Sequence, residues 1–231
     1  MSISTAIILA GGLGTRLRSV VSDLPKCMAP VNGRPFLDHV IDYLQKQGVT
    51  HYIFSVGYKA EAIIQHIQTS YPHINADFAV ENSPLGTGGA IHYACQYAKE
   101  ENAIIVNGDT LFEVNISELS EIHLSHQSEC TLSLKPMHQF ERYGVVTMNE
   151  KNQIIGFKEK QYYESGLING GVYALNISKF MEHQFPKVFS FEKDYMEAYY
   201  SKGLFYGYIS DSYFIDIGIP EDYSKAQHEL N

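Results

Sequence analysis

The chain has 231 residues, of which 45% are hydrophobic, and it carries a formal net charge of -9 at pH 7. This is the composition of an average globular protein, and it excludes disordered, collagen-like and coiled-coil chains. The excess of acidic residues argues against broad nucleic-acid binding, because phosphate backbones require a basic surface. At about 150 residues per domain, the length allows one large α/β domain or two small ones.

The start of the chain and its cysteines indicate a cytoplasmic protein. The longest N-terminal apolar stretch, Ala6–Ala10, has no basic leader and is broken at once by two glycines. It is too short for a membrane span and lacks the features of a signal peptide, so we expect no membrane association. Three cysteines without CxxC spacing, Cys27, Cys95 and Cys130, predict plain thiols rather than a disulfide framework or a structural zinc site.

Strand and helix patterns alternate in the first half of the chain. Hydrophobic spacing and terminal signals predict, in order, strand Thr5–Ala10, helix Pro35–Gln47, strand His51–Val56, helix Lys59–Ser70, strand Asp77–Glu81, helix Gly89–Lys99 and strand Ala103–Val106. Strands that alternate with helices form parallel sheets with right-handed crossovers. We therefore expect an α/β fold built on such a sheet.

The second half of the chain is less regular. Its pattern predicts strands over Cys130–Lys135, Gly144–Met148, Ile154–Lys158 and Gly170–Ala174, and helices near Ser178, over Glu192–Ser201 and over Pro220–Leu230. This half fits a mixed sheet with an added lobe. Because no linker, repeat or low-complexity segment interrupts the chain, we expect a single domain over residues 1–231.

The strongest local signal is the glycine-rich segment Leu9–Arg18, which follows the first predicted strand, where open α/β sheets bind ligands. A dinucleotide fingerprint fails here because Leu17 replaces its third glycine, and the Gly-Lys-Ser/Thr of a P-loop is absent. Backbone N–H groups of such a loop can still hold phosphate, with Arg16 and Arg18 as cations. The segment favours a nucleoside triphosphate site over a tight turn with surface arginines.

Together with this loop, the segment Leu24–Val31 resembles the signature of the sugar nucleotidyltransferases, which join a sugar 1-phosphate to a nucleoside triphosphate. Later segments follow in the family's order: Glu81–Gly89, Asn107–Asp109, Arg142–Val145, Phe157–Lys160, Ile168–Tyr173 and Phe214–Tyr223. The resemblance covers nearly the whole chain. It implies a Rossmann-like, three-layer α/β/α fold with a mixed, mainly parallel sheet and a smaller substrate-binding lobe. Residues 1–110 would mainly bind the nucleotide and residues 111–231 mainly the sugar phosphate.

Within the family, the chain looks most like the bacterial D-glycero-D-manno-heptose 1-phosphate guanylyltransferases, with the compact mannose 1-phosphate guanylyltransferases close behind. The resemblance implies GTP and a heptose 1-phosphate as substrates and GDP-heptose and pyrophosphate as products. The alternatives are a mannose substrate, or a uridylyl or thymidylyl transferase acting on a hexose 1-phosphate. An inactive nucleotide-sugar sensor is a remote alternative, because the residues that carry the chemistry are retained. The chain is expected to be a monomer or a homodimer.

In this reaction the sugar phosphate oxygen attacks the α-phosphorus and pyrophosphate leaves, so the enzyme must align two polyanions and neutralise their charge. Asp109 and Asp216 match the family's two Mg²⁺ ligands, in keeping with the preference of Mg²⁺ for one or two carboxylates plus phosphate oxygens. The resemblance assigns Arg16 to the leaving β- and γ-phosphates and Lys26 to the phosphates at the reacting centre.

The resemblance also assigns the substrate contacts. Lys160 matches the lysine that holds the sugar phosphate, and Lys158 shares its strand face as a weaker candidate. Glu159 and Asn169 match positions that bind sugar hydroxyls, and Gly144 allows close backbone approach to the sugar. The expected nucleotide-binding residues are Leu9, Gly11, Gly12, Gly14, Thr15, Glu81, Leu85, Gly86 and Gly88.

Glu81 bears on the choice of base. It stands where thymidylyl and many uridylyl relatives carry glutamine, and a carboxylate can accept both the N1–H and N2–H₂ donors of guanine. Gly88 is expected to leave room for a purine, with Leu85 beside the base. These features favour GTP, although a carboxylate here also occurs with uridine substrates.

Two further positions carry expectations. Cys27 stands where proline is usual after the lysine, a change that could loosen the loop holding Lys26. His123 and His126, at helical spacing, are expected to be surface residues rather than a metal pair.

Overall fold

The computed structural model describes residues 2–12, 24–202 and 204–230. A nine-stranded sheet forms its centre, with seven strands in the order β10-β9-β11-β6-β1-β4-β5; β8 pairs with β11, and β12 pairs with β8. The parallel part consists of β1 (Thr5–Leu9), β4 (His51–Val56), β5 (Asn75–Val80) and β6 (Asn102–Asn107). The alternation in the first half of the sequence therefore predicted these strands correctly.

Helices cover both faces of the sheet. On one face lie α1 (Phe36–Lys46), α2 (Ala60–Ser70), α4 (Ile116–Ser125) and α7 (Pro220–Glu229). On the other lie α3 (Gly86–Ala94), α5 (Ile177–Glu182), α6 (Glu197–Tyr199) and the short turns η3 (Cys95–Tyr97), η4 (Phe191–Met196) and η5 (Tyr200–Lys202). Successive residues of β1 alternate between two cores, with Ile8 in the first and Ile7 in the second. This arrangement confirms the predicted three-layer α/β/α fold.

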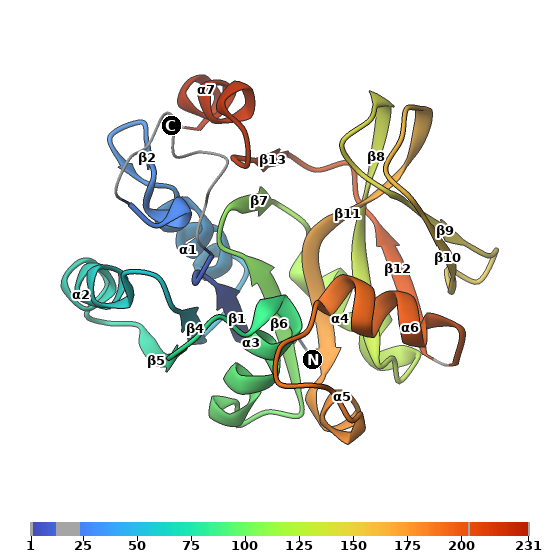
Figure 1. The fold of residues 1–231 in the computed structure, drawn as a ribbon, viewed down its shortest axis with the longest axis horizontal. Helices are drawn as coiled ribbons and strands as arrows, with labels where there is room; N and C mark the ends of the chain where they lie inside the picture. The colour runs from blue at the N-terminus through green and yellow to red at the C-terminus, as the bar shows by residue number, and fades with distance from the viewer. Residues whose placement is uncertain (1, 13–23, 203, 231) are drawn as a thin grey trace.

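Antiparallel strands extend the sheet in the second half of the chain. They are β8 (Cys130–Phe140), β9 (Val145–Met148), β10 (Ile154–Lys158) and β11 (Tyr163–Asn176), with β12 (Phe205–Ile209) parallel to β8. In Figure 1, β8, β9 and β10 lie at the end of the molecule opposite α2. Strands β8 and β11 are longer than predicted because their outer parts are half-exposed and lack the buried pattern of the inner parts.

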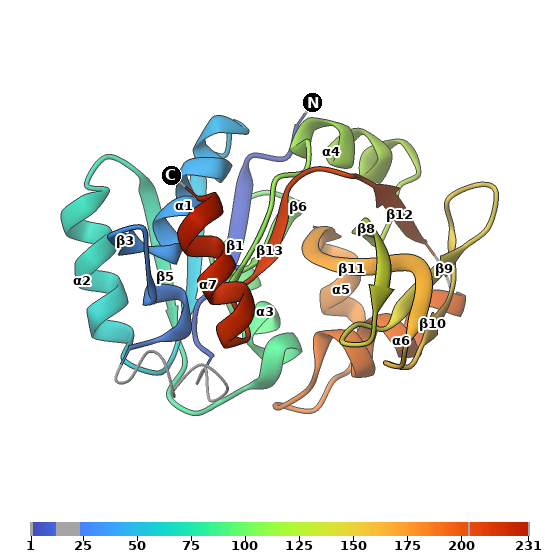
Figure 2. The same cartoon turned by 90° about the horizontal axis from the view of Figure 1, so that it is seen from above.

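Two small ribbons complete the fold. One pairs β2 (Pro30–Val31) with β3 (Arg34–Pro35), next to the 3-10 turn η2 (Lys26–Met28), and the other pairs β7 (Thr110–Phe112) with β13 (Phe214–Asp216). Helix α7 follows β13 and lies beside the first ribbon, where the Tyr223 hydroxyl donates a hydrogen bond to the Pro30 carbonyl at 2.5 Å (Figure 2). The chain's last helix is thereby fixed to its N-terminal third. No helix in the described part of the chain could span a membrane.

Three local predictions differ from the structure. Helix α3 begins at Gly86, three residues before the predicted start, because the Phe189 carbonyl accepts hydrogen bonds from Gly88 N and Gly89 N and thereby satisfies its first turn. Residues 191–196 form π-helical turns rather than a regular helix. His123 is buried, bonded to Thr131 Oγ1 and Asn102 Oδ1, so its expected surface position was wrong.

Candidate active site

Two adjoining cavities open where β1 and β6 end. The first, of about 600 Å³, is lined by the ends of β1 and β4, the segment after β5 and the first turn of α3. The second, of about 630 Å³, is lined by β9, β10, β11 and the π-helical turns η4. Asn107, Asp109 and Glu192 line both cavities. Two ligands bound in them would therefore meet at Asp109.

The first cavity collects most of the residues expected to bind a nucleotide. Those that line it are Leu9, Gly11, Gly12, Glu81, Leu85 and Gly86. A Cβ added at Gly11 would lie 2.9 Å from Glu81 Oε1, so a side chain there would displace that carboxylate. Gly14, Thr15 and Arg16 lie outside the described residues.

Glu81 projects into this cavity with part of its hydrogen-bonding capacity in use. Its carboxylate accepts hydrogen bonds from Leu85 N at 3.0 Å and from Ser55 Oγ at 3.3 Å. Burial raises the pKa of this carboxyl above its ordinary value, against the lowering effect of these two donors. A carboxylate offers about four acceptor sites, so two remain for a pair of ligand donors.

Gly88 does not line either cavity. It is buried in α3, and a Cβ added there would collide with the ring of Phe189. The absence of a side chain at Gly88 therefore accommodates Phe189, and the space expected for a purine beside this residue is filled by protein. The first turn of α3 contributes Gly86, Thr87 and Ala90 to the first cavity instead.

The most concentrated charge of the site lies where the cavities meet. Lys26 Nζ is 2.5 Å from Asp109 Oδ2 and 3.5 Å from Asp216 Oδ1, and its side chain is 12% exposed. The two aspartates are brought together by the β7–β13 ribbon, in which Asp216 lies opposite Thr110. Gly218 N donates a hydrogen bond to Asp216 Oδ1 at 2.8 Å and orients that carboxylate. Residues separated by 190 positions thus form one charged cluster.

Cys27 anchors the turn that carries Lys26. Its side chain is buried, its thiol lies 3.7 Å from the Ala10 carbonyl, and burial raises its pKa to about 12. A neutral, packed thiol fills this position. Cys95 and Cys130 are also buried and free.

The carboxylates of Asp109 and Asp216 suit Mg²⁺ but not a structural zinc ion. No group of three or more His, Cys, Asp or Glu side chains with metal-ligating geometry occurs among residues 2–12, 24–202 and 204–230. A structural zinc ion needs about four protein ligands and does not fit Asp109 and Asp216. Mg²⁺ takes one or two carboxylates and completes its shell with phosphate and water oxygens, so it fits this pair once Lys26 moves away.

The second cavity contains the residues expected to hold the sugar phosphate: Gly144, Lys158, Glu159, Lys160 and Asn169. Strand β10 ends at Lys158, so Lys160 lies beyond the strand and the argument from a shared strand face was wrong. Both lysines nevertheless line the cavity, together with Lys26 and Lys193. The same cavity is lined by five carboxylates, those of Asp109, Glu159, Glu192, Glu197 and Asp216, so an anionic ligand would depend on the positions of individual lysines rather than on the net charge.

Gly144 and Asn169 also have structural roles in the strands around the second cavity. A Cβ at Gly144 would lie 2.5 Å from the Lys158 carbonyl, so glycine is required by the packing of β10 against it. Asn169 Oδ1 accepts a hydrogen bond from Gly171 N at 3.0 Å, where the register of β11 against β8 shifts. Both residues shape the cavity wall as well as lining it.

Several lining residues were not expected from the sequence. Asn107 and Tyr143 lie within segments that resemble the family, and a closer reading of those segments could have identified them. Glu192 and Lys193 belong to the π-helical turns and carry no motif. Glu192 accepts hydrogen bonds from Thr87 Oγ1 and Ser190 Oγ, and so joins the walls of the two cavities.

Comparison with known proteins agrees with this geometry. The model of the nucleotidyl transferase family matches residues 5–231. The chain is 52% identical to D-glycero-alpha-D-manno-heptose 1-phosphate guanylyltransferase of Aneurinibacillus thermoaerophilus, over 97% of both chains. It is 44% identical to the protein of the same name from Campylobacter jejuni, over 94% of this chain and 96% of that one.

A solved structure supports the same assignment. The crystal structure of HddC from Yersinia pseudotuberculosis complexed with GMP-PN has a TM-score of 0.88 and 38% identity, covering 99% of this chain and 100% of that chain. The family model spans both cavities and the charged cluster between them. The chain therefore belongs to the nucleotidyl transferase family.

Proposed function

We propose that this protein transfers a guanylyl group from GTP to D-glycero-α-D-manno-heptose 1-phosphate, giving GDP-heptose and pyrophosphate. The observation that carries the proposal is the meeting of two cavities at Asp109, beside Lys26 and Asp216. Relatives at 52% and 44% identity are named for this reaction, which supports the choice of base and sugar.

The chain's own residues account for the chemistry as follows. An oxygen of the sugar phosphate forms a bond to the α-phosphorus of GTP, the bond between this phosphorus and the bridging oxygen breaks, and pyrophosphate leaves with that electron pair. Lys158, Lys160 and Lys193 hold the attacking phosphate in the second cavity. Lys26, at the junction, neutralises charge on the α-phosphate. Arg16 is proposed to hold the leaving phosphates.

We assign Mg²⁺ to Asp109 and Asp216. When bound, the ion supplies positive charge that draws the phosphate oxygens together. Lys26, which lies beside both carboxylates, would be the cation that contacts a phosphate oxygen once the ion is bound. The β7–β13 ribbon, in which Asp216 lies opposite Thr110, brings the two aspartates together.

Glu81 is proposed to select guanine. Its two unused acceptor sites complement the adjacent N1–H and N2–H₂ donors of that base, and Leu85 supplies an apolar wall. Uracil and thymine present one donor, N3–H, so they would leave one acceptor unpaired.

The test is pyrophosphate release with Mg²⁺ across GTP, UTP, dTTP, CTP and ATP, each combined with heptose, mannose and glucose 1-phosphates. We expect activity with GTP and the heptose. A preference for mannose 1-phosphate would overturn the sugar assignment and keep the role of Glu81. A pyrimidine preference would overturn the role of Glu81, and inactivity throughout would overturn the enzymatic function.

A further inference from the structure

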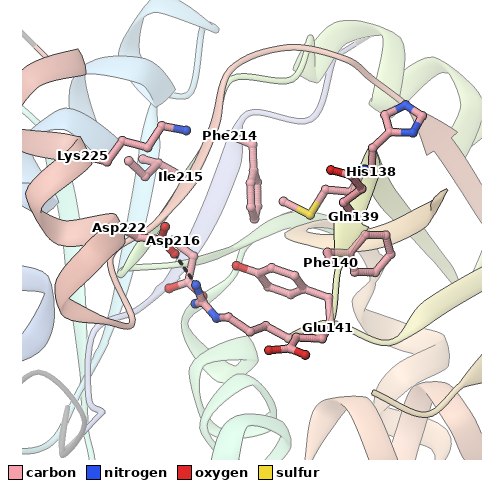
Figure 3. Close-up of a pocket in the computed structure, with 12 residues that line it drawn as sticks. His138, Gln139, Phe140, Glu141, Phe214, Ile215, Asp216, Asp222 and Lys225 are labelled. Atoms are coloured by element: carbon pink, nitrogen blue, oxygen red, sulfur yellow. Dashed lines mark hydrogen bonds and ion pairs between the residues drawn. The ribbon is translucent and has the colours of Figure 1, made fainter. Parts of the chain in front are cut away.

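A third cavity, of about 300 Å³, lies beside the second one and shares Tyr143 and Asp216 with it. One wall is the end of β8 and the turn after it, which includes His138, Phe140 and Glu141; the other is β13 and the start of α7 (Figure 3). An ion pair crosses between the walls to Asp222, drawn as a dashed line in Figure 3. Its residues lie in the segments Arg142–Val145 and Phe214–Tyr223, but neither the resemblance nor the proposed chemistry gives the pair a role.

The partner of Asp222 is Arg142, with 2.6 Å between Nη1 and Oδ2. The guanidinium of Arg142 also lies over the ring of Tyr143, 5.5 Å from its centroid. Tyr143 in turn packs edge-on against Phe214 with centroids 6.1 Å apart, and both residues line the third cavity together with Asp216. Two consecutive residues of the β8–β9 turn therefore hold both ends of the segment that carries Asp216.

This link connects the two functional parts of the site. Tyr143 and the adjacent Gly144 form part of the wall of the sugar phosphate cavity. Asp216 belongs to the charged cluster and, through the β7–β13 ribbon, lies next to Asp109. A shift of the β8–β9 turn away from α7 would separate the sugar phosphate from the carboxylates.

We propose that Arg142 is a positioning residue, which by pairing with Asp222 holds Tyr143 against Phe214 in the strand that ends at Asp216, and so aligns the sugar phosphate cavity with the carboxylate pair. The inference rests on the proposed nucleotidyl transfer at Asp109. Its effect is geometric: the Arg142 and Asp222 side chains are 35% and 29% exposed, and such pairs contribute little to folding stability. Loss of the link would instead weaken the binding of the sugar phosphate and of a metal ion at Asp216, because it displaces the cavity wall from the carboxylates.

The chain offers a matched control. Arg34 and Asp42 form an ion pair of 2.7 Å between side chains that are each 36% exposed, and they line none of the three cavities. Arg34→Met therefore removes an arginine pair of similar length and exposure without touching the site.

The experiment compares Arg142→Met, Asp222→Asn and Arg34→Met in steady-state assays with GTP and the sugar 1-phosphate that the wild type uses. We expect the first two to raise KM for the sugar 1-phosphate and the half-saturating Mg²⁺ concentration about tenfold, with KM for GTP within about twofold. The double variant should be no worse than either single one, because both remove the same link. Arg142→Lys should recover part of the loss, since lysine keeps the charge without the planar fork.

Arg34→Met should leave all three constants unchanged. A lower kcat with unchanged KM values would indicate loss of folded protein and overturn the proposal, as would equal increases in both substrate KM values. Amide hydrogen exchange tests the Arg142–Asp222 link without any substrate. It can therefore show that the link is absent even if the proposed function is wrong. Residues 143–146 and 214–218 should exchange faster in Arg142→Met than in the wild type and Arg34→Met; unchanged exchange there would contradict the link even in an inactive protein.

Discussion

At the scale of single residues, Lys26 occupies the space between the two proposed metal ligands. Its ammonium contacts both Asp109 and Asp216, so a divalent ion and Lys26 would repel each other there. We expect Lys26→Met to lower turnover by at least about 100-fold. In the absence of nucleotide, the same variant should bind Mn²⁺ more tightly than the wild type does, as measured by water proton relaxation.

The control for this effect is the double variant Lys26→Met/Asp216→Asn. It lacks one of the carboxylates exposed by the first change and should lose the gain in Mn²⁺ affinity. Equal Mn²⁺ affinities of the wild type and Lys26→Met would show that Lys26 does not compete with the ion.

Glu81 gives a prediction about the base. Glu81→Gln keeps the size of the side chain but replaces one acceptor with a donor, which cannot pair with a guanine donor. We expect kcat/KM for GTP to fall about 10- to 100-fold, while values for UTP and dTTP change less. Glu113→Gln, a similar change at a residue that lines neither substrate cavity, serves as the control. An unchanged ratio of GTP to UTP would remove Glu81 from base selection.

His123 should make folding stability depend on pH. Burial lowers the pKa of this imidazole from 6.5 to about 4, so between these values the unfolded chain binds a proton that the folded protein does not. Stability therefore falls as the pH drops through this window, by roughly 3 kcal/mol from this group. We expect His123→Gln to be less stable at pH 7 and to show a shallower decline towards pH 4 in urea denaturation. If the free energy of unfolding fell equally with pH in the wild type and in His123→Gln, His123 would not be the source of the pH dependence.

At the scale of elements, α3 is hydrogen-bonded to and packed against the segment before η4. The Phe189 carbonyl accepts from the first turn of α3, and its ring covers Gly88. We expect Gly88→Ala to destabilise the fold by about 1–3 kcal/mol, because the added methyl group overpacks this contact. In a Phe189→Leu background, which lacks the ring, Gly88→Ala should lower the free energy of unfolding by less, as measured by urea denaturation. If Gly88→Ala instead kept full stability and raised only KM for GTP, the glycine would be explained by the space it leaves for a purine base rather than by Phe189.

Elements with a strong buried pattern were predictable from the sequence. Strand β4 is buried along its whole length, and its bounds, His51–Val56, match the prediction. Helix α4 was not predicted, although Asn115 caps it by accepting from Ser117 N and Glu118 N. Strands β7 and β13 have three residues each and are too short to show a period.

The sequence named part of the candidate site but not its geometry. Motif resemblance brought Lys26, Asp109 and Asp216 together, but no pattern along the chain shows that the lysine lies between the carboxylates. That contact depends on pairing between β7 and β13, which are about 100 residues apart. The contacts of Arg142 and Glu192 were not predicted for the same reason, because their partners Asp222 and Thr87 are distant in sequence.

At the scale of the whole molecule, one sheet joins the two halves of the chain. Strand β11 pairs with β6 over Val172–Asn176, and both cores include residues from either half. Residues 1–110 alone would leave β6 as an unpaired edge and expose the buried faces that the second half covers. We therefore expect this fragment to remain unfolded or to aggregate, as circular dichroism and gel filtration would show.

The intact chain should unfold in a single transition, because its two main cores lie on opposite faces of the same nine-stranded sheet, which runs through both halves. The sequence has 17 tyrosines and no tryptophan, so tyrosine fluorescence reports on both halves while far-ultraviolet circular dichroism reports on the backbone. We expect the two probes to give coincident urea curves. Curves with different midpoints would show that the sugar phosphate half unfolds separately, and the alignment of the two cavities would then depend on local links such as Arg142–Asp222 rather than on the sheet.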